Sequence, residues 1–254
     1  MKTESTLVIQ SHTSPLPHAW LRTCLASVEQ WARSSQFEYL FIGDELFDVI
    51  SPELLEKTRT QKVVAADLAR LRWIQMSLKE YETVIWCDAD FLIFNPDQFT
   101  LLSENYALGR EIWIQSENNK LKHYIKVHNA FLMFRKDNTF LDFYTEIAEN
   151  LLRKNTGRMP PQFIGPKLLT ALHNIAQCPV LETAGMLSPL VINNIAQQSG
   201  PALDLFISAC KYPVYAANLC ASLYQDSHDA TKEIEICIEV LLNKEMTLNR
   251  ESIS

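Results

Sequence analysis

Glycine is scarce in this 254-residue sequence, which contains only six. The glycine-rich phosphate-binding patterns G-x-G-x-x-G and G-x-x-x-x-G-K-[ST] are both missing, so the sequence gives little support to a dinucleotide-binding or P-loop enzyme. No serine lies in a G-x-S-x-G context, which argues against a hydrolase with a nucleophile elbow. These absences disfavour three common classes of nucleotide and ester chemistry.

Basic residues and long hydrophobic runs are also in short supply. Lys and Arg number 23 against 30 Asp and Glu, which gives a net charge of −7, and no basic block occurs. Because sequence-independent binding of nucleic acid relies on clustered Lys and Arg, we expect no nucleic-acid partner. No run approaches the roughly 18 apolar residues of a membrane-spanning helix, and the first residues do not resemble a signal peptide. We therefore expect no transmembrane segment.

The six cysteines lie far apart and form no C-x-x-C pair, so the sequence indicates neither a zinc site nor a disulfide framework. Several of them lie inside apolar runs, where cysteine behaves as a small buried hydrophobic residue. A reducing cytoplasm is the simplest setting for such a chain. We therefore predict a cytoplasmic location.

The remaining composition is that of an ordinary soluble enzyme, with 47% hydrophobic and 21% charged residues. Strand-like runs rich in β-branched and aromatic residues alternate with segments of helical periodicity. We predict strands at 7–10, 39–42, 83–87, 106–115, 130–134, 179–182 and 214–217. We predict helices after Ser51-Pro52 and at 20–31, 64–80, 140–152, 166–175 and 233–242. This alternation predicts an α/β fold with a mostly parallel sheet.

Polar residues lie at the ends of the first three predicted strands. Gln10, Ser11 and His12 end the first strand, residues 43–44 (Gly-Asp) follow the second, and residues 88–90 (Asp-Ala-Asp) follow the third. Ligands of such sheets bind at the carboxyl ends of the strands, so we expect Gln10, Ser11 and His12 to contact substrate. For His12, an ordinary loop histidine is an equally good interpretation.

The acidic pair Asp88 and Asp90 is the strongest chemical feature of the sequence. The two residues stand two apart at the end of an apolar strand, and positions i and i+2 of an extended chain face the same way. Two carboxylates side by side repel each other, and burial adds a desolvation cost. A divalent cation relieves both costs, and oxygen ligands suit Mg²⁺ or Mn²⁺. The alternative is a pair of loop aspartates that cap the next element.

A second pair, Asp67 and Arg70, lies on the preceding predicted helix. The two residues are three apart and share a helix face. Taken alone, the spacing indicates a surface ion pair that contributes little to stability. Because the next strand carries the acidic pair, the arginine could instead meet a phosphate, or hold Asp67 in place to accept a hydrogen bond from a sugar hydroxyl.

The segments around these residues resemble one family. Segments 66–70 (Ala-Asp-Leu-Ala-Arg) and 84–90 (Val-Ile-Trp-Cys-Asp-Ala-Asp), followed by Asn95-Pro96, occur in the order seen in the DXD-motif retaining glycosyltransferases of the GT-A fold. Segments 128–133 (His-Asn-Ala-Phe-Leu-Met) and 165–169 (Gly-Pro-Lys-Leu-Leu) are similar to later motifs of that family. The matches run from about residue 64 to residue 175, and the ordered set is more specific than any single piece.

The resemblance implies a mannosyl- or galactosyltransferase-like enzyme with a nucleotide-sugar donor, most simply a UDP- or GDP-hexose. It implies that Mn²⁺ or Mg²⁺ bridges the donor diphosphate to Asp88 and Asp90, and that the anomeric configuration is retained. We expect His128 to be structural. The substrate contacts that the resemblance implies are Asp67, Arg70, Asp88, Asn129, Gly165, Pro166 and Lys167.

Two departures from the family pattern bear on these expectations. Before the acidic pair, residues 81–87 replace the family's Gly-Gly-x-Tyr-Leu run. The family often carries a C-terminal histidine ligand in a His-Gly-Ser-Trp-like ending, whereas this chain offers residues 225–229 (Gln-Asp-Ser-His-Asp). We take His228 as the candidate third metal ligand, because neutral imidazole is acceptable to Mn²⁺. The alternative stays open that Ser227 or Asp229 caps the last helix and that His228 is solvated.

We therefore predict a single GT-A-like, Rossmann-type domain over residues 1–254, with a mostly parallel mixed sheet. The nucleotide-binding part would span about 1–97, the sugar and acceptor part about 98–243, and a loose tail 244–254. The predicted activity is metal-dependent transfer of a hexose to a glycan, lipid or small-molecule acceptor. Two alternatives remain. One is a nucleotide-sugar-binding protein without turnover, and the other is an aspartate-dependent phosphatase, for which Phe91-Leu92 after the acidic pair is unusual.

Overall fold

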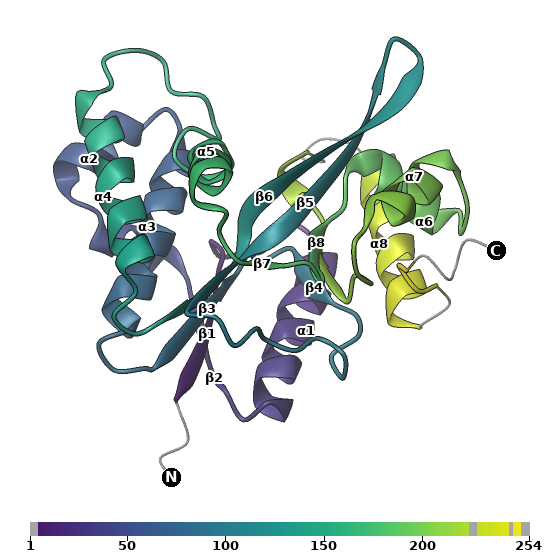
Figure 1. Cartoon of the computed structure of the whole chain (residues 1–254), viewed down its shortest axis with the longest axis horizontal. Coiled ribbons are helices and arrows are strands. Elements are labelled where there is room, and N and C mark those ends of the chain that lie inside the picture. The colour runs from purple at the N-terminus through teal and green to yellow at the C-terminus, as the bar shows by residue number, and fades with distance from the viewer. Residues whose placement is uncertain (1–4, 224–227, 244–245, 250–254) are drawn as a thin grey trace.

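Two mixed sheets form the framework of the protein, whose computed structural model describes residues 5–223, 228–243 and 246–249 (Figure 1). The strands are β1 (Thr6–Ser11), β2 (Glu38–Ile42), β3 (Thr83–Cys87), β4 (Phe91–Ile93), β5 (Tyr106–Glu117), β6 (Lys120–Arg135), β7 (Val180–Leu181), β8 (Ala184–Met186) and β9 (Ala216–Asn218). The α-helices are α1 (Trp20–Ser34), α2 (Pro52–Thr58), α3 (Lys62–Ser77), α4 (Thr139–Lys154), α5 (Pro166–Ala176), α6 (Pro189–Ala196), α7 (Pro201–Ala209) and α8 (His228–Leu242). Two short 3₁₀ helices are η1 (Asp44–Val49) and η2 (Ala221–Leu223). Within these residues, no helix has the length and apolar character needed to span a bilayer.

The larger sheet holds six strands in the order β2-β1-β3-β6-β5-β7. Strand β1 pairs in parallel with β2 and β3, and β7 pairs in parallel with β5. Strand β6 runs antiparallel to both of its neighbours, β3 and β5. The predicted α/β fold is confirmed, and the parallel pairings outnumber the antiparallel ones. The parallel half brings the carboxyl ends of β1, β2 and β3 to one edge.

Both faces of the sheet are covered by helices, because the central strands are apolar at successive positions. In β3, Val84 and Trp86 pack with helices α3 and α4, whereas Ile85 and Cys87 pack on the opposite face with helix α1. A strand that is buried on both faces has a continuous apolar sequence, which is why this run predicts a buried strand. Full burial of each large apolar side chain contributes about 1.5–3 kcal/mol, which stabilises the position of β3 in the sheet.

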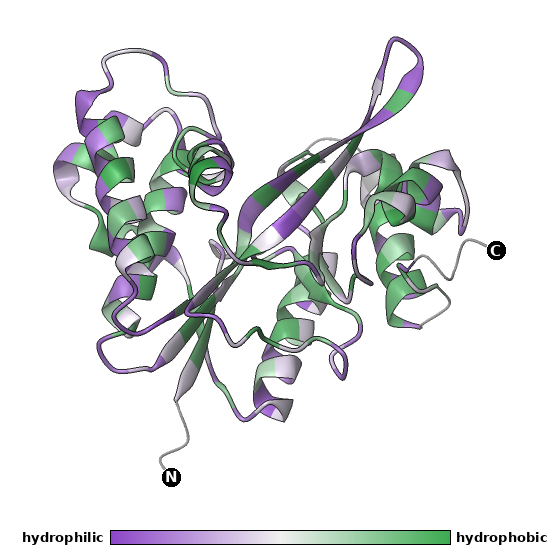
Figure 2. Cartoon of the chain, viewed as in Figure 1, coloured by the Kyte–Doolittle hydropathy of each residue, from purple (hydrophilic) through white to green (hydrophobic). Residues whose placement is uncertain are grey.

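A second core lies beside the larger sheet and is built mainly by helices α6, α7 and α8. Figure 2 shows that these three helices are largely hydrophobic. They pack against the first turns of α1, against Ile112 and Ile114 of β5, and against the smaller sheet, whose order is β4-β9-β8. Helices α6 and α7 and strands β4 and β8 are elements that the sequence analysis missed, because so few residues show no clear period.

Met246 and Leu248, near the C-terminus, also pack onto this second core. Leu248 is buried and forms an antiparallel bridge with Val214. The prediction of a loose tail is therefore wrong for residues 246–249, while residues 244–245 and 250–254 lie outside the described part of the chain. An apolar residue can anchor a terminal segment in this way even where the local sequence is polar.

Strands β5 and β6 continue beyond the sheet as a two-stranded ribbon, seen at the upper right of Figure 1. They join at Asn118 and Asn119, whose φ angles of 50° and 58° are both positive. Two such residues make the tight turn whose twist matches that of the flanking strands. The apolar run predicts a strand only from residue 130, but β6 starts at Lys120. Its first residues are mostly exposed and polar, and pairing with β5 holds them in a strand without a hydrophobic signal.

Gly109 provides a test of how β5 and β6 pack. A Cβ atom added there would lie 2.2 Å from the ring of His128, which is fully buried. We expect Gly109→Ala to destabilise the protein by roughly 1–3 kcal/mol, because the ring has no space to move. The control Gly157→Ala places its Cβ with no atom within 4 Å, and should change stability by less than about 0.5 kcal/mol. Urea unfolding measures both variants, and equal stabilities would contradict this packing.

Candidate functional site

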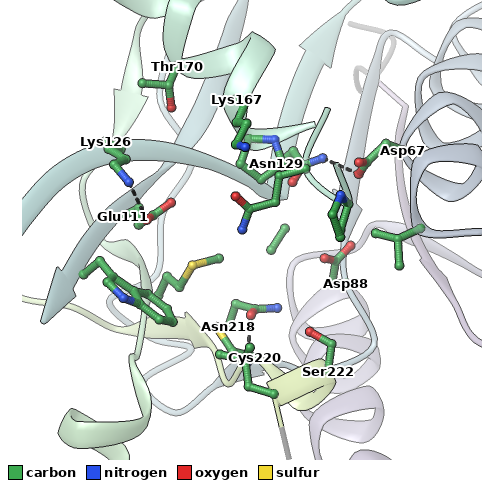
Figure 3. A pocket seen from close by; sticks show the side chains of 18 of the residues that line it. Asp67, Asp88, Glu111, Lys126, Asn129, Lys167, Thr170, Asn218, Cys220 and Ser222 are labelled. Carbon is green, nitrogen blue, oxygen red and sulfur yellow. Dashed lines mark hydrogen bonds and ion pairs between the residues drawn. The ribbon is translucent and has the colours of Figure 1, made fainter. Parts of the chain in front are cut away.

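Two pockets meet at the acidic pair that follows β3. The ribbon pocket, of about 580 Å³, lies between the β5–β6 ribbon and helix α5 (Figure 3), and the strand-end pocket, of about 860 Å³, lies at the carboxyl ends of β1 and β2. Arg70, Asp88 and Asp90 line both. Other residues of the ribbon pocket include Asp67, Glu111, Trp113, Lys126, Asn129, Pro166, Lys167 and Thr170. Other residues of the strand-end pocket include Ser11, His12, Thr13, Gly43, Phe47, Lys62 and Trp86.

The three polar strand ends that the sequence analysis singled out therefore meet around one cavity. Ser11 ends β1 and His12 follows it, Gly43 follows β2, and Asp88 follows β3. All four residues line the strand-end pocket. Gln10 differs from the expectation, because it is fully buried and lines neither pocket. Its side-chain NH₂ donates to the carbonyl of Asp88 (3.0 Å), and its oxygen accepts from the Tyr39 hydroxyl (3.0 Å). In this structure Gln10 therefore holds the backbone of Asp88 and does not line a pocket.

The carboxylate of Asp88 is held by two donors from one side. Its Oδ1 atom lies 2.8 Å from Arg70 Nη2 and accepts a hydrogen bond from Trp86 Nε1 at 2.8 Å. The guanidinium of Arg70 also lies over the Trp86 ring, 5.2 Å from its centroid. Within the described residues, Oδ2 of Asp88 has no hydrogen-bond partner, and 26% of the side chain is exposed. One oxygen of Asp88 is thus fixed, and the other is available to a ligand.

Asp90 accepts hydrogen bonds from residues about 130 positions later in the sequence. Its Oδ1 accepts from Asn218 Nδ2 (2.6 Å), and its Oδ2 accepts from the backbone N–H of Ala221 (2.7 Å). Burial, and then the neighbouring carboxylate of Asp88, raise the pKa of Asp90 to about 6. Each carboxylate oxygen has a second lone pair, so Asp90 can accept these bonds and still bind a cation.

Asp67 and Arg70 are buried, so their interpretation as a surface ion pair is wrong. Only 4% of Asp67 and 7% of Arg70 is exposed. Asp67 Oδ1 accepts from Asn129 Nδ2 (2.7 Å) and lies 3.7 Å from Arg70 Nη1, while Arg70 Nη1 donates to the carbonyl of Asn129 (2.5 Å). Figure 3 shows this link between Asn129 and Asp67 at the wall of the ribbon pocket. Helix α3 and strands β3 and β6 are therefore joined by one polar network.

Among the residues that the structure describes, two buried atoms of this network have no hydrogen-bond partner: Asp67 Oδ2 and Arg70 Nε. Asp67 Oδ2 faces Gly165, where an added Cβ would lie 2.4 Å from it. Burial raises the pKa of Asp67 to about 6, against the opposing effects of Arg70 and of the Asn129 hydrogen bond. Gly165 thus allows the start of helix α5 to approach Asp67, and the next residues, Pro166 and Lys167, line the ribbon pocket.

His128 has a packing environment that is typical of a structural residue. It is fully buried, its Nδ1 accepts from the backbone N–H of Ala130 (3.2 Å), and its Nε2 lies 3.2 Å from the carbonyl of Ala184. Burial lowers its pKa to about 4, so the ring is neutral at physiological pH. His228 is the first residue of helix α8, and its side chain lies outside the part of the structure that is described. Its role as a metal ligand stays a prediction.

The charges of the site suit a divalent cation. Asp67, Asp88 and Asp90 contribute three carboxylates, and Arg70 is the one cation that contacts them within the described residues. That part of the chain contains no group of three or more His, Cys, Asp or Glu side chains placed to hold a metal. Asp88 and Asp90 alone fit a cation that takes its other oxygen ligands from substrate and water, as Mg²⁺ and Mn²⁺ do.

Several residues of the site were missed by the sequence analysis. Asn218 and Ala221 hold Asp90 from about 130 positions away, and no local pattern marks them. Glu111, Trp113 and Lys126 line the ribbon pocket from the β5–β6 ribbon. Their signal was the alternation of Glu111 and Trp113 with buried isoleucines, which indicates a strand with one polar face.

No protein-family model and no curated protein matches this sequence. Among solved structures, it is similar to a glycosyltransferase involved in the glycosylation of the major capsid of PBCV-1, at 12% identity over 91% of this chain and 99% of that chain, with a TM-score of 0.49. It is also similar to the galactosyltransferase LgtC in complex with donor and acceptor sugar analogs, at 13% identity over 91% of this chain and 95% of that chain, with a TM-score of 0.48. A third similar structure is the apo form of the glycosyltransferase GlyE from Streptococcus pneumoniae TIGR4, at 12% identity over 96% of this chain and 63% of that chain, with a TM-score of 0.46. Because these TM-scores lie below 0.5, we assign function from the residues of the site.

The raised pKa of Asp67 gives a stability test in metal-free buffer. The pKa rises from 3.8 to about 6, so the folded protein binds this proton more tightly than the unfolded chain does. Stability is then lost as the pH rises through that interval. We expect Asp67→Asn, which keeps the acceptor for Asn129, to exceed the wild type by roughly 2–3 kcal/mol at pH 7.5, and by almost nothing near pH 4.

Chemical denaturation with EDTA present, at several pH values, measures this difference. The control Asp97→Asn removes an exposed carboxylate and should stay within about 0.5 kcal/mol of the wild type throughout. A destabilised Asp67→Asn variant at pH 7.5 would show that the charge of Asp67 stabilises the fold through Arg70, contrary to this expectation.

Proposed function

We propose that this protein is a glycosyltransferase that moves a hexose from a UDP- or GDP-sugar to an acceptor. The observation that carries the proposal is the position of the acidic pair at the junction of two pockets. A nucleotide-sugar has two bulky ends joined by a diphosphate, and a site of this shape accommodates one end on each side of the pair. The strand-end pocket is the larger and suits the nucleotide, and the ribbon pocket suits the sugar and the acceptor.

Asp88 and Asp90 would hold Mn²⁺ or Mg²⁺, and the cation would supply positive charge that stabilises the nucleoside diphosphate as the leaving group. Arg70 orients Asp88 and places a positive charge at the same junction. Lys62, at the start of α3, lines the strand-end pocket and adds a second positive charge on the nucleotide side. These groups suit a diphosphate.

Asn129 is the best candidate for a sugar contact. Its amide NH₂ is committed to Asp67, which fixes the rotation of the side chain, and its oxygen has no partner within the described residues. It lines the ribbon pocket, so that oxygen can accept a hydrogen bond from a sugar hydroxyl. Asp67 then acts as a positioning residue for Asn129 and Arg70. Retention of the anomeric configuration rests on the sequence resemblance, and a cytoplasmic location rests on the cysteine content.

The aspartate-dependent phosphatase is less well supported than glycosyl transfer. A nucleophilic carboxylate needs an unencumbered oxygen aimed at the phosphorus atom, and both oxygens of Asp90 accept hydrogen bonds. Asp88 has one such oxygen, but its other oxygen is paired with Arg70. The positive charge of Arg70 reduces the nucleophilicity of the Asp88 carboxylate. A nucleotide-sugar-binding protein without turnover would use the same pockets, so kinetics must separate it from an enzyme.

Binding of nucleotide and binding of metal should be coupled. Titration calorimetry with UDP and with GDP should show at least about tenfold tighter binding of one of them when Mn²⁺ is present. Asp88→Asn should remove this coupling, because the free Oδ2 is replaced by an NH₂ that repels a cation. The surface variant Asp97→Asn should keep it. Nucleotide binding that is indifferent to Mn²⁺ and Mg²⁺ in the wild type would overturn the metal assignment.

Turnover distinguishes the enzyme from the binding protein. With Mn²⁺ and no acceptor, the wild type should slowly hydrolyse its nucleotide-sugar, and release of the nucleoside diphosphate measures this rate. Asp88→Asn should lower the rate by roughly 100-fold or more, the loss expected for one group that stabilises developing charge. Asp88→Asn keeps the Oδ1 acceptor for Trp86 and Arg70, so its melting temperature should change little. Tight binding without any release of diphosphate would favour the binding protein.

A further inference from the structure

One face of the β5–β6 ribbon continues the wall of the ribbon pocket outwards. Residues 111, 113, 115 and 117 of β5 pair directly with residues 126, 124, 122 and 120 of β6. Glu111, Trp113, Gln115 and Lys126 line the pocket, so the alternation of a strand places the rest of these pairs on the same face. The intervening residues Ile112 and Ile114 face the other way, into the second core. We name this polar and aromatic surface the ribbon face.

The side chains of the ribbon face are held by one another. Glu117 accepts hydrogen bonds from Gln115 (2.6 Å), Lys122 (2.7 Å) and Tyr124 (2.5 Å). The bond from Lys122, followed by those from Tyr124 and Gln115, lowers the pKa of Glu117 to about 2. Nearer the pocket, Lys126 Nζ lies 3.9 Å from Glu111 Oε1, a pair that Figure 3 shows, and 5.9 Å from the centroid of the Tyr124 ring. The charges on this face are therefore largely paired.

Two half-buried aromatic residues, Trp113 and Tyr124, lie opposite each other in the middle of the face. Within the described residues, the indole N–H of Trp113 has no hydrogen-bond partner. A flat aromatic surface flanked by amide, hydroxyl and paired ionic groups suits a ligand that combines C–H faces with many hydroxyls. A free anion or cation would have to compete with the existing ion pairs, and a lipid chain would find too little apolar surface.

We infer that the ribbon face binds a neutral oligosaccharide acceptor, whose end enters the ribbon pocket to receive the sugar. This inference rests on the proposed glycosyl transfer, and it names the acceptor class. From Glu111 to Glu117 the strand extends roughly 20 Å, at about 3.4 Å per residue, which gives space for about three or four pyranose rings. Trp113 and Tyr124 stack on one ring, and the groups around Glu117 hydrogen-bond the rings farther from the pocket.

Binding of neutral oligosaccharides tests the inference directly. Malto-, cello- and manno-oligosaccharides of one to four units are titrated into the protein with Mn²⁺ and the preferred nucleoside diphosphate present. The affinity for at least one series should rise with length. Trp113→Ala should weaken binding of the tetrasaccharide about tenfold, the effect of losing roughly one aromatic contact, and Trp113→Phe should restore part of it. The control Ile125→Ala alters the opposite face of the ribbon, where the side chain is 54% exposed, and should bind like the wild type.

Different results would contradict oligosaccharide binding and glycosyl transfer. Trp113 does not line the strand-end pocket, so the nucleoside diphosphate should bind to Trp113→Ala with Mn²⁺ as it does to the wild type, and this also shows that the variant is folded. If no series gains affinity with length, or if Trp113→Ala and Ile125→Ala lose binding equally, the oligosaccharide inference is overturned while glycosyl transfer stands. If oligosaccharides bind as expected but no nucleotide-sugar is ever turned over, the ribbon face is supported and the transferase proposal fails.

Discussion

The site depends on the ion pair between Arg70 and Asp88, which joins helix α3 to the end of strand β3 at 2.8 Å. Arg70 is almost fully buried, and a buried guanidinium is costly unless its donors are satisfied. Asp88 and the carbonyl of Asn129 satisfy the two Nη donors, and the Trp86 ring covers the guanidinium. Truncation of Asp88 would leave a buried N–H group of Arg70 without an acceptor, so these elements have one relative arrangement in which the network is complete.

The same network leaves negative charge in excess. Arg70 is shared between Asp67 and Asp88, and within the described residues Asp90 has only neutral N–H donors. Burial therefore raises the pKa values of Asp67 and Asp90. A set of groups selected for stability would carry a second cation or fewer carboxylates. An excess of carboxylates at the junction of two pockets is instead typical of a site whose missing charge comes from a bound cation. The energetic cost that the fold bears here is the best physical sign of function.

Local patterns predicted the central part of the fold and the acidic pair, because both depend on neighbouring residues. The apolar run of β3 and the helical period of α1 are each visible in one short window. Asn218 and Ala221 were not predictable, since their contacts with Asp90 are set by the packing of the second core. The position of Gln10 was not predictable for a related reason. A polar residue at a strand end can face a ligand pocket or bond to a neighbouring segment, and its sequence is the same in both cases.

The second core has a part in the site although none of its helices carries the acidic pair. Ile112 and Ile114 pack into it, and this fixes which face of the ribbon is turned towards the pocket. Since side chains alternate along a strand, a register shift of one residue would bring isoleucines to the pocket and bury Trp113. The tight turn at Asn118 and Asn119 fixes that register from the other end. Under the proposed function, helices α6–α8 thus determine which side chains would meet the sugar, and the sheet determines where the diphosphate would lie.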